Sequence, residues 1–221
     1  MLNFTKLAAA AAVVSALFVA PALASDQSDL VNRANRTVSH LRTDPAFAQA
    51  ARMIHSARAV LIIPRLVKGG FIFGAEGGDG VLLKRTGRSW SQPAFFSLAS
   101  ASFGLQIGLQ QAELVFIIMS DRALSGIVHG ETKLGAGAGL TVVTLSSGAE
   151  GATTSHGGDI IVWSSGTGAY GGLTFNGSVV KPRNDWNADF YGKDVGIMGV
   201  LNNKVKSPDT AVLRRNLATV W

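Results

Sequence analysis

The middle of this chain consists of short apolar runs separated by glycine-rich segments, and no other feature constrains its fold as strongly. Residues 101–180 hold 16 of the 26 glycines in the 221-residue sequence. Short runs of this kind, bounded by turn-forming residues, are typical of strands in antiparallel sheets. The expected strands lie at residues 59–63, 71–73, 81–83, 114–119, 140–145, 159–163 and 173–180.

Proline and glycine lead to two local predictions. Pro64 directly follows the run at 59–63 and is expected to end that strand, because proline cannot donate a ladder hydrogen bond. The segment 77–80, Gly-Gly-Asp-Gly, is expected to form a tight β-turn with positive φ angles. The alternative, a phosphate-cradling loop, would need a helix after it, and residues 81–85 have the pattern of a strand.

Helical periodicity occurs at both ends of the chain. The apolar residues Leu30, Ala34, Val38 and Leu41 recur at spacings that place them on one helix face. Further helices are expected after Thr43-Asp44-Pro45, over residues 184–191, and after Ser207-Pro208 with Leu213, Leu217 and Val220 pointing inward. The predicted fold class is therefore α+β, with N-terminal helices packed on a glycine-rich, mainly antiparallel β-sandwich or barrel-like body and with a C-terminal helix.

Residues 1–24 are predicted to be a secretory signal peptide. Lys6 precedes the apolar stretch 7–20, and Ala22-Leu23-Ala24 supplies small residues for cleavage. The apolar stretch is shorter than the roughly 20 residues that a membrane-spanning helix needs. The mature protein is therefore expected to begin at Ser25, with residues 25–221 forming a single domain. The alanine-rich leader is typical of bacteria, which predicts a periplasmic protein attached peripherally to a membrane.

The sequence contains no motif for catalysis or for metal binding. It has no cysteine, which excludes disulfides, thiolate metal sites and cysteine nucleophiles. The histidines at 40, 55, 129 and 156 lack a metal-ligand spacing, and His129-Gly-Glu131 is at most half of a metal site. No Gly-x-Ser-x-Gly motif is present. We therefore expect no catalytic residue, no metal and no cofactor, and we predict that the protein is not an enzyme.

Positive charge is concentrated toward the two ends of the mature chain. The sequence has 20 basic and 14 acidic residues, a net charge of +6. Clustered arginine and lysine beside amphipathic helices favour a surface that binds lipid headgroups, although a solvated basic face is the alternative. The candidate lipid-binding residues are Arg33, Arg36, Arg52, Arg65, Lys68, Lys84, Arg85 and Arg88. Nucleic acid is not expected as a partner, because few aromatic residues interleave with these cations and the chain is predicted to be exported.

Several motifs resemble those of the SYLF lipid-binding domain family, and they occur in the family's order. They are Val60-Leu-Ile-Ile-Pro64, Lys68-Gly-Gly-Phe-Ile-Phe-Gly74, Gly77-Gly-Asp-Gly-Val81, Trp90-Ser91-x-Pro93-Ala94, Gly104-Leu-Gln-Ile-Gly108 and Asn187-Ala-Asp-Phe-Tyr-Gly192. The resemblance implies binding to phosphoinositides or other anionic phospholipids, which eukaryotic relatives couple to actin binding in endocytosis. The predicted export signal and the lack of an SH3 module in this sequence depart from those relatives, so actin is not expected as a partner. The motif glycines and Trp90 are expected to determine the fold rather than to contact lipid.

The leading functional hypothesis is an exported peripheral membrane protein that binds anionic phospholipids or phosphoinositides through a basic surface. One alternative is an integral outer-membrane β-barrel, which the glycine-rich strands would suit but an aromatic content of 8% does not favour. Another is a secreted glycan-binding module or enzyme, which no motif supports. The sequence also leaves open whether the helices within residues 25–58 insert into a membrane or pack against the body.

Overall fold

The structure of the protein is a computed structural model. It describes residues 26–43, 48–70, 73–103, 110–130, 133–134, 142–146, 158–165, 178–192 and 195–220. The predicted signal peptide, the expected helix start at residues 44–45 and the motif at 104–108 lie outside these residues.

Helices flank a nine-stranded sheet in the described part of the chain. The helices are α1 (Asp26–Thr43), α2 (Ala48–Ser56), α3 (Asp121–His129), α4 (Asn184–Tyr191), α5 (Gly196–Leu201) and α6 (Ala211–Ala218), with the 3₁₀ helix η3 (Pro208–Thr210) before α6. The strands are β1 (Ala59–Gly70), β2 (Phe73–Thr86), β3 (Ser89–Trp90), β4 (Ala94–Phe103), β5 (Gln110–Ile118), β6 (Lys133–Leu134), β7 (Val142–Ser146), β8 (Ile160–Ser164) and β9 (Ser178–Pro182). None of the described helices combines the length and the apolar character needed to span a membrane.

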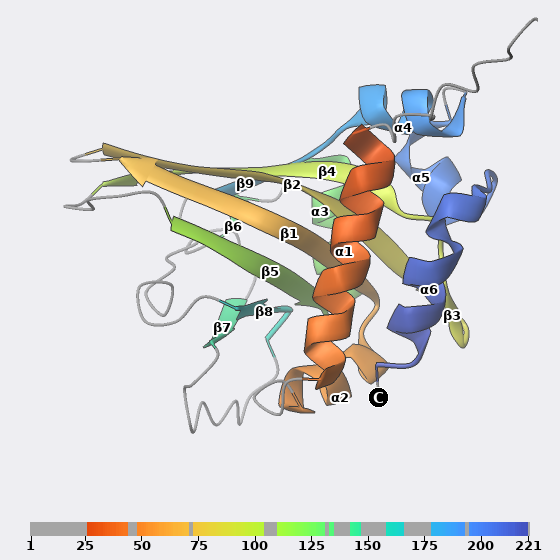
Figure 1. Ribbon diagram of the computed structural model, residues 1–221, viewed down its shortest axis with the longest axis horizontal. Coiled ribbons are helices and arrows are strands. Elements are labelled where there is room, and N and C mark those ends of the chain that lie inside the picture. Colours follow the sequence, from red (N-terminus) through yellow and green to blue (C-terminus); the bar gives the residue numbers. More distant parts are fainter. Residues whose placement is uncertain are drawn as a thin grey trace, which may run out of the picture.

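The strands form one open, almost entirely antiparallel sheet. Their order is β6-β9-β4-β2-β1-β5-β8-β7, with β3 paired to β2, and only β7 and β8 run parallel. The predicted α+β class, with helices at both ends of the chain, is confirmed (Figure 1). The body differs from the expected sandwich or barrel, because the described strands make a single sheet whose two faces are covered by helices.

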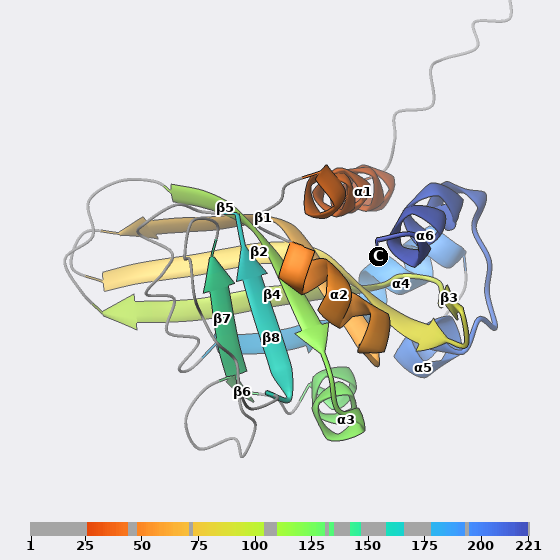
Figure 2. The ribbon, with the colours of Figure 1, turned by 90° about the horizontal axis from the view of Figure 1, so that it is seen from below.

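Each face of the sheet carries its own apolar core. Residues of α1, α2 and α6 pack on one face, and residues of α3 and α5 pack on the other. Figure 2 shows α1 and α6 on one side of the sheet and α3 on the opposite side. Strand β1 lies near the centre of the sheet and contributes to both cores. Val60 and Ile62 enter the core with α1, α2 and α6, while Leu61 and Ile63 enter the core with α3 and α5. This explains why the run is apolar at every position rather than at alternate ones.

Helix α1 packs on the sheet through the apolar face that the sequence predicts. Leu30, Val31, Ala34, Val38 and Leu41 are exposed by only 0 to 3%. Burial of a side chain of this size stabilises a fold by about 1.5–3 kcal/mol. This answers the question that the sequence left open for α1, whose apolar face belongs to the core of the domain.

Strand β1 continues through Pro64 instead of ending there. Between Ile63 and Leu66, β1 has one residue more than the facing segment of β5, which defines a β-bulge at Pro64 and Arg65. A proline is tolerated at a bulge because the regular ladder is already interrupted there. The extra residue also shifts the alternation of the strand by one position, so that Leu66 enters the same core as Ile63. The predicted strand end at Pro64 is therefore wrong.

The segment 77–80 lies inside β2 and does not form the predicted turn. The described glycines with positive φ are elsewhere, at positions 87, 130, 192 and 196. The glycines of β2 serve a close approach to β1. A β-carbon on Gly78 would lie 2.5 Å from the carbonyl oxygen of Arg65, and one on Gly80 would lie 2.5 Å from that of Ile62.

The sequence reasoning missed α5, and it missed α3 because it assigned the glycine-rich middle to strands alone. Local signals for α3 are nevertheless present. Ser120 caps the helix by accepting a hydrogen bond from the backbone N–H of Ala123, and Gly130 ends it with φ 69°. Its residues Leu124, Ile127 and Val128 are buried at helical spacing.

Helix α4 is joined to β4 by hydrogen bonds from motif residues. The side chain of Asn187 accepts a hydrogen bond from Phe95 N–H at 3.0 Å and donates one to the carbonyl oxygen of Arg183 at 2.8 Å. The Tyr191 hydroxyl donates to the carbonyl oxygen of Pro93 at 2.7 Å. These motif residues therefore hold α4 against the sheet.

Candidate functional site

A pocket of about 420 Å³ lies between the N-terminal half of α1 and the strands β1 and β2. Figure 1 shows that these two strands extend well past α1, so that part of the sheet surface next to the helix is not covered by it. The pocket is lined by Leu30, Arg33, Arg65, Val67, Gly77, Gly78 and Asp79. Its lining thus joins two arginines, one carboxylate and a floor that includes two glycines.

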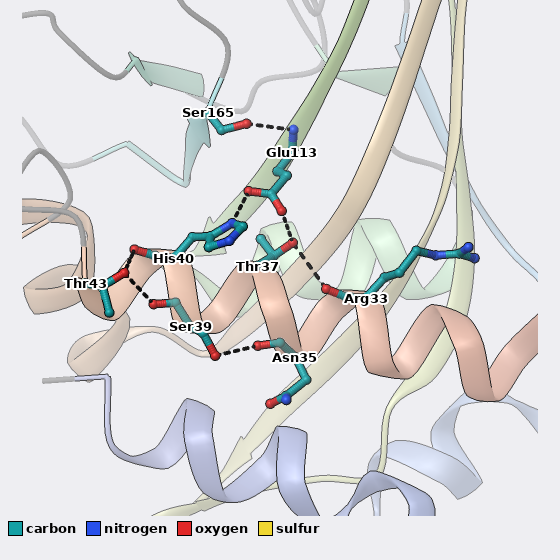
Figure 3. A network of polar contacts seen from close by, with 8 residues as sticks. All are labelled: Arg33, Asn35, Thr37, Ser39, His40, Thr43, Glu113 and Ser165. Atoms are coloured by element: carbon teal, nitrogen blue, oxygen red, sulfur yellow. Dashed lines mark hydrogen bonds and ion pairs between the residues drawn. The ribbon is translucent and has the colours of Figure 1, made fainter.

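The two arginines reach the pocket from different elements. Arg65 is exposed and belongs to the bulge of β1, while Arg33 is on α1, three residues before the exposed Arg36. In Figure 3 the Arg33 side chain points away from the polar cluster around Glu113. Within the described ranges, none of these three arginines has an ion-pair or side-chain hydrogen-bond partner.

The carboxylate of Asp79 is already engaged by a cation from the other end of the chain. Arg183 Nη1 lies 3.1 Å from Asp79 Oδ1, and Arg183 Nη2 lies 3.0 Å from Asp185 Oδ2. The guanidinium also stacks 4.1 Å from the ring centre of Trp186. The hydrogen bond between Arg183 and Asp185 raises the pKa of the arginine and lowers the pKa of the carboxyl. Asp79 is therefore held in place, and its charge is partly offset.

A second carboxylate close to the bulge is held by a separate network, which Figure 3 shows. Thr37 donates its hydroxyl to Glu113 Oε1 at 2.9 Å, and His40 Nδ1 lies 2.8 Å from Glu113 Oε2. The backbone N–H of Glu113 donates to Ser165 Oγ at 2.9 Å. Glu113 thus binds α1 to β5 and forms no ion pair with Arg65.

This arrangement favours an anionic ligand over a cationic one. Two arginines without carboxylate partners face one carboxylate that shares Arg183 with Asp185. Arginine side chains are suited to phosphate groups because the planar guanidinium can donate two parallel hydrogen bonds. In the part of the chain that the structure describes, no group of three His, Asp or Glu residues is placed to hold a metal ion.

Of the eight candidate residues, the structure brings Arg33 and Arg65 together at the pocket, and Arg36 lies on α1 three residues after Arg33. Lys68 is buried in an ion pair with Glu76, its Nζ 3.1 Å from Oε1, with side chains 9% and 7% exposed. Its neighbour Val67 lines the pocket, so strand alternation directs Lys68 to the opposite face of the sheet. Lys84 also lies apart from the pocket, where it donates to Asn202 Oδ1 at 3.2 Å, at the end of α5.

The remaining three candidates lie on α2 and at the other end of β2. Arg85 donates to the carbonyl oxygens of Ile54 and Ala57 at the end of α2, and its guanidinium lies 4.2 Å from the ring centre of Trp90. Burial lowers the pKa of Arg85. Arg52 on α2 and Arg88 in the turn before β3 are exposed. Arg85 therefore supports the fold, and these residues do not form one surface with Arg33 and Arg65.

Sequence reasoning missed Asp79 and Arg183 as members of this site. Their ion pair joins residues 104 positions apart, and no local pattern around either residue indicates it. Asp79 was interpreted as part of a turn, whereas it lies on β2 on the same face as Val81. The periodicity of β2 would have placed Asp79 toward α1 if the glycines had been assigned to a strand.

The fold and the pocket together define an α+β domain with a small, arginine-lined site between helix α1 and the central strands of the sheet. Residues 99–220 match the family Ysc84, described as Las17-binding protein actin regulator. Because this match covers more than half of the chain, the protein belongs to the Ysc84 family, the family of the SYLF domain. The resemblance drawn from the motifs is confirmed.

The relatives are longer eukaryotic proteins. Protein YSC84 of Saccharomyces cerevisiae is 29% identical over 156 residues, which are 68% of this chain and 33% of the yeast protein. SH3 domain-containing YSC84-like protein 1 of Homo sapiens is 27% identical over 173 residues, which are 77% of this chain and 50% of the human protein. The chain thus spans a third to a half of the length of these relatives. No solved structure matches it.

Proposed function

We propose that this protein is an exported peripheral membrane protein that binds anionic phospholipids, phosphoinositides among them. The supporting observation is the α1 basic surface, which we define as Arg33, Arg36 and Arg65, three cations with no carboxylate partner in the described chain. Unpaired arginines near an anionic bilayer would be attracted to its phosphates without first breaking an internal ion pair.

The expected attachment is weak and reversible. Each well-placed arginine contributes about 1 kcal/mol near an anionic membrane, so three contribute on the order of 3 kcal/mol. Because the apolar residues of α1 are buried in the core, they are not available to insert into a membrane. Electrostatic attraction is therefore the main source of membrane binding by this helix. Such attraction is screened by salt, with a range of about 10 Å at 0.1 M and about 3 Å at 1 M.

Co-sedimentation with liposomes tests this proposal. The protein should pellet with anionic vesicles and not with neutral ones, and the bound fraction should fall as salt rises from 0.1 to 1 M. Charge reversal of Arg33, Arg36 and Arg65 to Glu should abolish binding. The matched control reverses three exposed cations outside α1 and β1, namely Arg88, Lys204 and Lys206, and should retain most of it. Equal binding to neutral vesicles, or equal loss in both variants, would contradict the proposal.

We also propose that the protein is periplasmic after cleavage before Ser25. The predicted signal peptide supports this, and the intact mass of the exported protein measures it directly. A mature species that retains residues 1–24 would contradict the assignment.

The family description names a binding protein and regulator, and we propose that this chain likewise has no catalytic activity. Turnover in an esterase or phosphatase assay that survives repurification would overturn that statement.

Binding to a Las17-type protein is a second candidate function, favoured by the family description and by the name LAS seventeen-binding protein 3 of a yeast relative. The family match covers residues 99–220, which excludes Arg33, Arg65 and Asp79. Export would separate this chain from actin. We therefore do not expect actin as a partner in the periplasm. Co-pelleting of the purified protein with actin filaments or with a Las17-type protein would favour this second candidate.

A further inference from the structure

The geometry points to a specific headgroup site. We propose that the pocket between α1, β1 and β2 binds one phosphate ester of a polyol, with Arg33 and Arg65 holding the phosphate and Asp79 accepting a hydrogen bond from a free hydroxyl of the same headgroup. This inference rests on the proposed function for its lipid source, but it adds a defined pocket and a selectivity that diffuse charge attraction does not have.

The two arginines are suited to one phosphate because they approach the pocket from two elements. Arg33 comes from α1 and Arg65 from the bulge of β1, and both line the same cavity. Charge-assisted hydrogen bonds from two directions fix the position of a phosphate, whereas a single flexible cation would only attract it. Arg36 lies outside the pocket lining, so it can contribute to membrane attraction without contributing to this site.

The carboxylate of Asp79 indicates what else the ligand carries. Its Oδ1 accepts from Arg183, while Oδ2 has no donor among the described residues, and the side chain is 38% exposed in the pocket wall. An ionised carboxylate can only accept hydrogen bonds, so it needs a donor on the ligand. A neutral hydroxyl on the ligand fits better than an ammonium group, because the positive charges of Arg33, Arg65 and Arg183 would repel the ammonium.

The size of the pocket agrees with a headgroup and not with a whole lipid. Small-molecule sites span roughly 300–1,000 Å³, and this pocket of about 420 Å³ is at the lower end. Gly77 and Gly78 present backbone rather than side chains to the ligand. Acyl chains would therefore remain in the bilayer while the phosphate and its polyol enter the pocket.

Vesicles of equal charge separate this inference from simple electrostatics. Phosphatidylglycerol and phosphatidylserine each carry one net negative charge, but only the glycerol headgroup has free hydroxyls. At the same molar fraction, the protein should bind phosphatidylglycerol vesicles about fivefold more tightly, the size of one hydrogen bond. Equal binding to both lipids would contradict the proposed headgroup site in the pocket, but it would not contradict the proposed function.

Two alanine variants test the role of Asp79. Asp79→Ala should bring the preference for phosphatidylglycerol to about one, even if removal of a negative charge strengthens binding to both lipids. The control Asp185→Ala removes the other carboxylate partner of Arg183 and should keep the preference. Thermal unfolding of both variants establishes that each is folded at the assay temperature. A preference that survives Asp79→Ala would overturn the role of this carboxylate.

The soluble headgroup glycerophosphoglycerol distinguishes a lipid from a free phosphate ester. Its titration should shift the NMR amide signals of Gly77 and Gly78, with an affinity about tenfold weaker in Arg33→Gln and in Arg65→Gln. The affinity should be nearly unchanged in Arg42→Gln, which removes an exposed cation of α1 outside the pocket and outside the α1 basic surface. Binding of this ester without binding to any anionic vesicle would keep the pocket and overturn the lipid as its source. Equal losses in Arg42→Gln and Arg33→Gln would show diffuse attraction and overturn the site.

Discussion

Gly78 and Arg65 lie so close across the β1–β2 pair that a β-carbon on the glycine would be 2.5 Å from the carbonyl oxygen of the arginine. The same β-carbon would lie 2.9 Å from a methyl carbon of Ile63. Glycine is therefore needed at position 78 for packing against the bulge that carries Arg65. The same contact links the glycine motif to the pocket.

Substitution of Gly78 by alanine should lower the free energy of unfolding by about 1–3 kcal/mol, because the added methyl group must displace backbone. Gly77→Ala is the matched control, since its β-carbon would meet only the Leu98 carbonyl oxygen, at an ordinary 3.7 Å. Urea unfolding of both variants measures the difference. If Gly77→Ala were as destabilising as Gly78→Ala, the close approach would not be the cause.

Substitution of Asn187 by alanine should cost about 1–3 kcal/mol, because it leaves the buried N–H of Phe95 without its acceptor. The neighbouring Asn184→Ala variant removes an exposed side chain from the start of α4 and should change stability by less than about 0.5 kcal/mol. Thermal unfolding followed by circular dichroism compares the two. Similar melting temperatures for both variants would argue against the structural role of Asn187.

Arg85 should prove to be a stability residue and Arg88 should not. Arg85→Met removes the hydrogen bonds to the carbonyls of Ile54 and Ala57, which should lower stability by about 2 kcal/mol. Arg88→Met removes the same charge from an exposed turn and should be nearly neutral. Below the melting temperature of both variants, vesicle binding should be equal. Selective loss of vesicle binding in Arg85→Met would show instead that Arg85 contributes to lipid binding.

Burial raises the pKa of the Tyr191 phenol above its usual value. Above about pH 10 the unfolded chain loses this proton while the folded protein keeps it, so stability should fall as pH rises, by about 1.4 kcal/mol per pH unit. Tyr191→Phe removes this dependence, and at neutral pH it costs about 1 kcal/mol for the lost bond to Pro93. Unfolding free energies measured between pH 8 and 11 should therefore fall less steeply in the variant. Parallel pH profiles for the two proteins would contradict this assignment.

Local patterns were sufficient for the amphipathic helices at the two ends. The spacing of Leu30, Ala34 and Val38 predicts the buried face of α1, and Leu213 and Leu217 predict that of α6. These predictions succeed because helix periodicity and side-chain hydrophobicity are properties of neighbouring residues. The family motifs are visible for the same reason, since each is a short continuous stretch.

The same local reasoning was wrong for the bulge and for the glycines of β2. Proline and glycine near positions 64 and 77–80 are compatible with a strand end and a turn when only their neighbours are considered. The close approach of β1 and β2 decides otherwise, because it needs a residue without a side chain beside the bulge. That requirement exists only between strands and has no signature within either one.

The sequence by itself determined the α+β class, the helical ends, the excess of positive charge and the family. Only the tertiary structure decided which cations share a surface, because it placed Arg33 and Arg65 at one pocket and assigned Lys68 and Arg85 to internal partners. It also paired Asp79 with Arg183 across 104 positions. The physical reason is that charge is a property of each residue, whereas its partner depends on which strand face and which distant segment the fold brings beside it.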